Sequence, residues 1–244
     1  MRIYLSPSTQ EYNEYVTGGT EEYYMNLVTD AAVPYLTASG VQYTRNTPAM
    51  TAASSIRQAN SGVYDFYLAL HSNAAPEGKY GSERGCIIYY YTYGRNSARA
   101  AGIFTEIFKG IYPEPARVRA VPTTTIGEVS KTKAPAVLIE IAYHDNRQDA
   151  DWITRNIPAI GRAAALGVTR YLSVPLVEPR APMRGTVTLS YGRLNIRARP
   201  SVSAQILTAV PNGTVLTVLG ESGGWYTVSW RGVTGFAAAR YISL

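Results

Sequence analysis

The 244-residue sequence is poor in the residue types that support disulfide bonds or membrane insertion. It contains a single cysteine, Cys86, so no disulfide can form within the chain. No stretch approaches the roughly 20 consecutive apolar residues that a transmembrane helix needs, so no membrane span is expected. The first residues, MRIYLSPST, have no apolar segment followed by a cleavage site, so the sequence predicts no secretory signal peptide.

Acidic residues are scarce towards the C-terminus. Residues 1–175 contain 16 Lys and Arg against 15 Asp and Glu, a net charge of +1. Residues 176–244 contain seven arginines and only two acidic residues, a net charge of +5. This asymmetry predicts an anionic partner for the C-terminal part of the chain. No nucleic-acid-binding motif accompanies the positive charge, so nucleic acid is not the expected partner.

The first 174 residues alternate between strand and helix patterns. Strands are predicted at residues 2–5, 41–44, 64–70, 86–92 and 137–143, and helices at residues 21–36, 51–60, 97–111 and 146–171. Such alternation predicts an α/β fold, with a doubly wound, mostly parallel sheet and helices on both faces. Residues 113–133 show no clear periodicity and lead directly into the last strand. We therefore expect this long connection to form the wall of a groove.

A proline-rich segment separates this part of the chain from a different pattern. Residues 175–183, PLVEPRAPM, contain three prolines and predict a stiff linker. Beyond it, short apolar segments alternate with Gly, Pro, Asn and Ser. Strands are predicted at residues 185–189, 194–196, 206–210, 215–219, 225–230 and 233–236. The sequence therefore predicts three parts: a catalytic domain at 1–174, a linker at 175–183 and a small all-β barrel at 184–244.

Three residues in the α/β part stand out as candidates for chemistry. Glu140 interrupts the apolar run 137–143, where a carboxylate is costly unless it is paired or performs a task. His71 directly follows the apolar strand 64–70, and His144 lies four residues after Glu140, on the same face if that strand continues. Ligands bind beyond the carboxyl ends of parallel strands, so these residues are expected at one rim.

Glu22, in the first turn of the first predicted helix, is a fourth candidate. Two histidines and a glutamate are the ligand types of a hydrolytic zinc site, which keeps one position open for water. Simpler structural roles are the alternatives: Glu22 complements the helix dipole, Glu140 is satisfied by an arginine or by backbone donors, and His144 helps to cap the following helix.

Several segments resemble a known enzyme family. LALHSNA, RQAN and PAVLIEIAYHDN are similar to segments of the zinc-dependent N-acetylmuramoyl-L-alanine amidases of the amidase-3 type, over roughly residues 1–172. The resemblance implies that Glu140 is the catalytic glutamate and that His71 and Glu22 are Zn²⁺ ligands. The expected reaction is hydrolysis of the peptidoglycan amide between N-acetylmuramic acid and L-alanine, with Asn73 holding a substrate amide.

One departure from the family concerns the metal site. The family usually has a histidine in a Gly-His-Gly motif after the first strand, whereas this chain has LSPSTQEYN there. His144 is the expected third ligand, and Gln10 and Tyr12 are weaker candidates, because neutral amide and phenol groups bind zinc poorly. The alternatives are a catalytically degenerate amidase fold that binds cell walls, or a zinc peptidase that cuts within the stem peptide.

The C-terminal part resembles a different family. GRLNIRARPS, PNGTVLTVLGESGGWYTVSW and GVTGFAAARYI are similar to segments of bacterial Src-homology-3-type domains, over about residues 184–244. The resemblance implies binding to bacterial peptidoglycan or to its attached anionic polymers; the alternative for Trp225 and Tyr226 is barrel core. In the absence of a signal peptide, the expected route to the cell wall is release through a holin or by cell lysis, as for an endolysin or autolysin.

Overall fold

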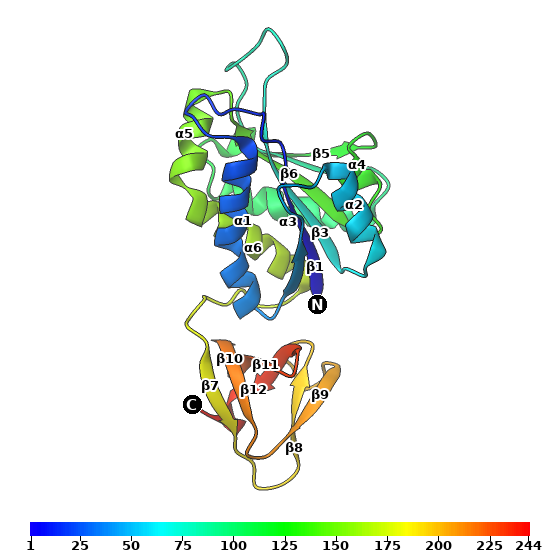
Figure 1. Cartoon of the computed structure of the whole chain (residues 1–244), viewed down its shortest axis with the longest axis vertical. Helices are drawn as coiled ribbons and strands as arrows, with labels where there is room; N and C mark the ends of the chain where they lie inside the picture. Colours follow the sequence, from blue (N-terminus) through cyan, green and yellow to red (C-terminus); the bar gives the residue numbers. More distant parts are fainter. The chain divides into compact units, whose positions relative to one another are not determined.

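The computed structural model describes residues 1–244, which divide into two compact units. The N-terminal unit comprises residues 2–33 and 43–171, and the C-terminal unit comprises Met1 and residues 34–42 and 172–244 (Figure 1). None of the helices has the length and apolar character needed to cross a bilayer. The linker at 175–183 and the domain boundaries on either side of it stay predictions.

A six-stranded mixed sheet forms the centre of the N-terminal unit. Its strands are β1 (Arg2–Pro7), β2 (Gln42–Arg45), β3 (Phe66–Asn73), β4 (Ile87–Tyr91), β5 (Arg119–Thr123) and β6 (Ala136–Tyr143), in the order β2-β1-β3-β6-β4-β5. Strands β1, β3 and β6 are parallel to one another, whereas β4 runs antiparallel to β6. The carboxyl ends of the three parallel strands therefore meet at one edge of the sheet.

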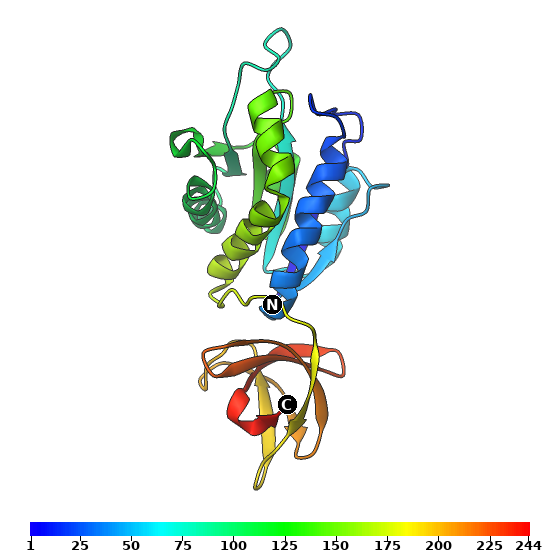
Figure 2. The ribbon, with the colours of Figure 1, turned by 90° about the vertical axis from the view of Figure 1, so that its left-hand side faces the viewer.

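Helices cover both faces of this sheet, which confirms the predicted α/β class (Figures 1 and 2). They are α1 (Glu21–Ala38), α2 (Ala52–Ser61), α3 (Arg95–Lys109), α4 (Gly127–Ser130), α5 (Arg147–Arg155) and α6 (Ile157–Leu172). On one face, Tyr67 of β3 packs with Ala59 of α2 and Val129 of α4. On the other face, Phe66 stacks on Phe104 of α3. Alternation along β3 thus sends neighbouring side chains into two separate cores.

Two predicted elements differ from the structure. The connection over residues 113–133 contains a 3₁₀ turn (Pro115–Arg117), β5 and α4, all too short to give a periodic signal. The single helix predicted over residues 146–171 is the pair α5 and α6, which meet at Asn156. Pro158 lies in the first turn of α6, where its missing N–H costs no helical hydrogen bond.

The C-terminal unit is all-β, as the sequence predicts, and contains a seven-stranded antiparallel sheet where six strands were expected. Its strands are β7 (Met183–Val187), β8 (Arg193–Arg197), β9 (Ile206–Pro211), β10 (Val215–Ser222), β11 (Trp225–Trp230), β12 (Val233–Ala238) and β13 (Ile242–Ser243), in the order β13-β7-β10-β11-β12-β8-β9. Alternate residues of these strands, among them Leu194, Ile196, Val218 and Val228, form its apolar core. Tyr226 and Trp230 are only partly buried against that core.

Candidate active site

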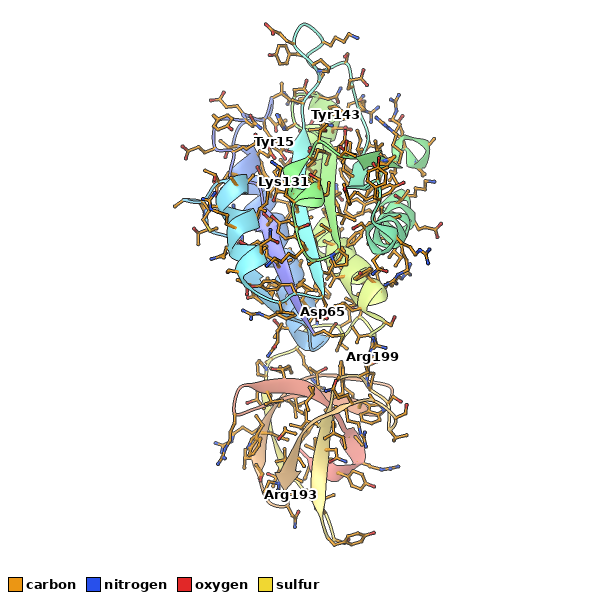
Figure 3. The ribbon with its side chains drawn as sticks, turned by 90° about the vertical axis from the view of Figure 1, so that its right-hand side faces the viewer. Tyr15, Asp65, Lys131, Tyr143, Arg193 and Arg199 are labelled. Carbon is orange, nitrogen blue, oxygen red and sulfur yellow. The ribbon has the colours of Figure 1, made fainter.

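A cavity of about 450 Å³ lies at the carboxyl ends of β1, β3 and β6. All three strands line it, with Ser6 and Pro7 from β1, His71 from β3, and Leu138 and Glu140 from β6. His71 and Glu140 are direct partners in the β3–β6 register, so their side chains leave the sheet on the same face. Figure 3 labels Tyr143, the last residue of β6, and Asp65, which precedes β3, at opposite ends of the unit. Because His71 and Glu140 are register partners and both line the cavity, the structure brings them together as expected.

His71 lies between two buried carboxylates. Its Nδ1 atom is 2.9 Å from Oε1 of Glu21, and its Nε2 atom is 2.9 Å from Oε2 of Glu128. Burial alone would lower the pKa of His71, but the hydrogen bonds to Glu128 and Glu21 and their negative charges raise it well above the ordinary value. Each ring nitrogen thus faces a buried carboxylate oxygen, an arrangement that favours the protonated imidazolium.

Each carboxylate also accepts hydrogen bonds from other side chains. Asn13 donates to Glu21 at 2.6 Å, while the Ser6 and Tyr67 hydroxyl groups donate to Glu128 at 2.6 and 2.7 Å. Burial alone would raise the pKa of both glutamates, but the hydrogen bond and positive charge of His71 hold it below the ordinary value. Both carboxylates are therefore ionised, and the charges are buried only because they are paired.

Glu140 differs from these two carboxylates because it has no charged partner in contact. Its side chain is partly exposed to the cavity, but its Oε2 atom is buried without a hydrogen-bond partner. Burial raises its pKa from 4.5 to about 7, with the charges of Glu21 and Glu128 adding to the effect and that of His71 opposing it. Both protonation states of Glu140 are thus populated near neutral pH.

The structure separates the two neighbouring glutamates at the start of α1. Glu21, not Glu22, lies beside His71. The Glu22 carboxylate instead accepts a hydrogen bond from Asn26, one turn along the same helix. Glu21 is in phase with the buried residues Met25 and Val28, so the helical period places it on the inner face and places Glu22 beside that face.

The structure also places His144 away from the cavity. Three residues of β3, from His71 to Asn73, face four residues of β6, from Glu140 to Tyr143, and Ala142 has a φ of 58°. This irregularity inserts one extra residue, which reverses the alternation beyond it. The His144 Nδ1 atom lies 3.0 Å from the Ser72 hydroxyl, on the face opposite His71, and its ring stacks on Tyr15.

The remaining candidates from the sequence are Gln10, Tyr12 and Asn73, and they differ in their position relative to the cavity. The Gln10 amide nitrogen is 3.4 Å from the His71 Nδ1 atom, and Gln10 belongs to the loop after β1, where the family usually has a histidine. Tyr12 lines the cavity but remains 75% exposed. Asn73 is not among the lining residues, and its side-chain oxygen accepts a hydrogen bond from the Ala74 backbone.

The donor chemistry of the site fits zinc, although the ligand set is short. No group of three or more His, Cys, Asp or Glu side chains is arranged to hold a metal ion. A nitrogen of His71 and an oxygen of Glu21 nevertheless face each other at 2.9 Å, and Glu140 Oε2 is a buried atom without a partner. Catalytic zinc sites use three protein ligands and one water, and His71 and Glu21 would supply two of those three ligands to a bound zinc ion.

Glu128 is a residue of this site that the sequence did not reveal. It belongs to the four-residue helix α4, within the connection expected to form a groove wall. Ile126, Gly127 and Glu128 do line the cavity. A sequence signal exists on β3, where Tyr67 and His71 are four residues apart on one face of the strand and both require a polar partner when buried. It does not identify which carboxylate supplies that partner.

The fold and the site together define an α/β protein whose cavity combines a histidine with carboxylates, groups that hydrolases use. Comparison with known proteins specifies the family. The family model of N-acetylmuramoyl-L-alanine amidases matches residues 9–170, and the bacterial SH3 domain model matches residues 192–243. The chain belongs to the N-acetylmuramoyl-L-alanine amidase family and carries a C-terminal bacterial SH3 domain. Both resemblances found in the sequence are thereby confirmed.

Individual relatives agree with this assignment. The chain is 30% identical over 135 residues to the putative N-acetylmuramoyl-L-alanine amidase YrvJ of Bacillus subtilis, a match that covers 52% of this chain and 24% of YrvJ. The chain therefore spans about a quarter of that relative's length. Among solved structures, the amidase AmiC2 of Nostoc punctiforme has a TM-score of 0.60 at 17% identity, covering 71% of this chain and 97% of AmiC2. The catalytic domain of the CD27L endolysin, which targets Clostridia difficile, has a TM-score of 0.56 at 19% identity, covering 71% and 97% of the two chains.

Proposed function

We propose that this chain hydrolyses the amide bond between N-acetylmuramic acid and L-alanine in peptidoglycan, and that the reaction depends on zinc. The observation that carries the proposal is the carboxylate of Glu140, whose Oε2 atom is buried without a partner and whose pKa is about 7. A general base acts best when its pKa lies near the operating pH. Membership of the amidase family supports the substrate class.

The proposed zinc ligands are the His71 Nδ1 atom and the Glu21 carboxylate. Glu128 accepts the Nε2 proton of His71, which fixes the ring orientation and leaves Nδ1 as the nitrogen available to a metal. Gln10, whose amide nitrogen lies 3.4 Å from the His71 Nδ1 atom, is the proposed candidate for a third protein ligand. A bound zinc ion would polarise the scissile carbonyl group and lower the pKa of a water molecule.

Glu140 performs both proton transfers in the proposed reaction. Its carboxylate takes a proton from the attacking water molecule as the oxygen adds to the carbonyl carbon. The protonated Glu140 then donates that proton to the alanine nitrogen, so the C–N bond breaks with a neutral amine as the leaving group. The apolar neighbours of Glu140 on β6 keep its pKa high enough for this second transfer.

The C-terminal unit is proposed to hold the enzyme on the cell wall, with residues 175–183 as the linker between the two domains. Its bacterial SH3 match and its excess of arginine support an interaction with peptidoglycan or its attached anionic polymers. The proposed site of action is the bacterial cell wall, reached after release through a holin or by cell lysis.

Zinc content and product mass test this proposal together. The full chain is stripped with a chelator and reloaded with zinc, its metal content is measured, and products from purified peptidoglycan are analysed by mass spectrometry. We expect one zinc per chain and peptides that begin with alanine. Glu21→Gln should lose zinc, whereas the neighbouring Glu22→Gln, the matched control, should retain it. Fragments cut within the stem peptide would instead indicate a peptidase, and intact peptidoglycan a wall-binding protein without activity.

A further inference from the structure

The C-terminal unit contains a second cavity, of about 370 Å³, that takes no part in the proposed reaction. Three of the seven arginines of the C-terminal part and three aromatic residues line this arginine pocket: Arg193, Arg197, Arg240, Tyr191, Trp225 and Tyr241. No acidic residue lines it. These side chains come from β8, β11, the turn before β8 and the 3₁₀ turn Ala239–Tyr241, so only the folded barrel brings them together.

The three arginines of the pocket are not neutralised by carboxylates. Arg193 is exposed, and its side chain makes no hydrogen bond or ion pair within the chain. Arg197 donates to the backbone carbonyl of Ala204, and the Arg240 guanidinium lies 4.9 Å from the ring centre of Tyr241. Positive charges gathered around one hollow repel one another, so an anion placed there is favoured.

Arg180 of the same unit shows the contrasting arrangement. Its guanidinium lies 3.6 Å from the Glu221 carboxylate and over the ring of Tyr226. Glu221 is one of only two acidic residues after residue 175. The fold thus pairs this acid with an arginine outside the pocket and leaves the pocket without a compensating charge.

The walls of the pocket suit a compact ligand that combines carboxylates with apolar groups. Tyr191 is 90% exposed beside the hollow, and Trp225 and Tyr241 are partly exposed. Flat aromatic faces bind apolar groups and peptide planes, while the guanidinium fork matches a carboxylate with two parallel hydrogen bonds. A long phosphate polymer needs positive charge spread along a surface. Here the pocket is a bounded hollow, and Arg184, Arg199 and Arg231 lie outside it.

We propose that the arginine pocket binds a short acidic peptide through its carboxylates. This proposal deepens the proposed function and rests on it, because the stem peptides of peptidoglycan carry free carboxylates. The pocket then supplies the recognition step by which the C-terminal unit attaches to the wall, separately from the cavity that contains Glu140.

Titration of the full chain with synthetic peptides tests the proposal. The probe is a tetrapeptide with one Glu side chain and a free C-terminal carboxylate, and the control peptide has Gln and a C-terminal amide. Neither contains a muramyl–alanine amide, so neither is a substrate of the proposed reaction. Binding is followed by calorimetry and by the indole N–H signal of Trp225 in NMR spectra. Polyphosphate is titrated in parallel.

We expect saturable binding of the acidic peptide, a shift of the Trp225 signal, and no binding of the amidated control. Arg193→Ala combined with Arg240→Ala should weaken binding at least roughly tenfold, because charge-assisted hydrogen bonds are lost. Arg199→Ala removes the same charge from a position well apart from Arg193 in the C-terminal unit (Figure 3) and should change the affinity less than twofold.

Three results would overturn the proposal: equal loss in the double variant and in Arg199→Ala, equal binding of the amidated peptide, or binding of polyphosphate alone. Unchanged NMR spectra of the variants without ligand verify that both fold. The proposed hydrolysis is tested separately. If it does not occur, no peptides that begin with alanine are released when wild-type chain is mixed with peptidoglycan. That result leaves the peptide titration unaffected.

Discussion

The two cavities of this protein differ in whether their charged side chains are paired with opposite charges. At the N-terminal site, the imidazolium of His71 is buried between two ionised carboxylates, whose side chains are only 1% and 5% exposed. In the arginine pocket, three cations share one hollow without an acidic residue. Burial removes water, so charges there must neutralise one another within the protein. At the surface, water screens like charges, and the chain can leave them unpaired for a ligand.

The largest expected effect concerns Glu140, the one carboxylate of the buried site that has no partner in contact. Glu140→Gln keeps the shape of the side chain but removes the proton acceptor. We expect peptidoglycan hydrolysis to fall roughly 100- to 10,000-fold, the usual size of a general-base contribution. Zinc content should stay unchanged, because Glu140 is not a proposed ligand. Near-normal turnover of this variant would assign Glu140 a structural role and remove the central argument for the reaction.

The next largest expected effect is a loss of stability when the buried carboxylates lose the charge that pairs with them. His71→Ala leaves Glu21 and Glu128 buried without their shared cation, so we expect the free energy of unfolding in the metal-free chain to fall by about 3–5 kcal/mol. His144→Ala removes a hydrogen bond to Ser72 and should cost only about 1–2 kcal/mol. Urea unfolding of both variants at pH 7 measures the difference. Equal losses would show that the two carboxylates do not depend on His71.

A third effect is the pH dependence that Glu140 gives to stability. Between pH 4.5 and about 7 the unfolded chain releases this proton while the folded chain keeps it. The raised pKa therefore lowers the free energy of unfolding as the pH rises through this window, by up to on the order of 3 kcal/mol.

Glu140→Gln removes this titration, so its stability relative to wild type should increase from pH 5 to pH 8. Urea unfolding of both chains at the two pH values, with chelator present, provides the measurement. Parallel pH profiles for the two chains would contradict the raised pKa.

The smallest effect concerns an exposed ion pair of the N-terminal unit. Arg147 and Asp151 are one turn apart on α5, with a nitrogen–oxygen distance of 3.3 Å, and the Arg147 side chain is 72% exposed. Arg147→Ala should therefore change the free energy of unfolding by only about 0.3–0.5 kcal/mol, and less at high salt. Thermal melts at low and high salt check this. A loss comparable to that of His71→Ala would remove the distinction between buried and exposed charges.

Part of the site could be predicted from local sequence patterns. The apolar runs of β3 and β6 identify parallel strands, and their carboxyl ends place His71 and Glu140 at one rim. Glu21 was within reach of the same reasoning, because it is in phase with Met25 and Val28 on α1. Glu22, by contrast, is one residue out of that phase. The strand and helix patterns had therefore already located this end of the cavity.

The remaining features depend on contacts that no local pattern contains. Glu128 meets His71 across 57 residues of sequence, and only the packing of α4 against the sheet brings them together. His144 leaves the cavity because of one extra residue in β6 near Ala142, and a pattern that assumes uninterrupted alternation cannot show such a bulge.

By itself, the sequence determined the α/β and all-β parts, the buried carboxylate of Glu140 and the excess of arginine near the C-terminus, because each follows from residue type and spacing along one segment. Tertiary structure alone decided which carboxylates pair with His71 and which three arginines share a pocket. The physical reason is that burial and charge pairing depend on distances between segments remote in sequence. Those distances are fixed only when both sheets have formed and their strands and helices have packed.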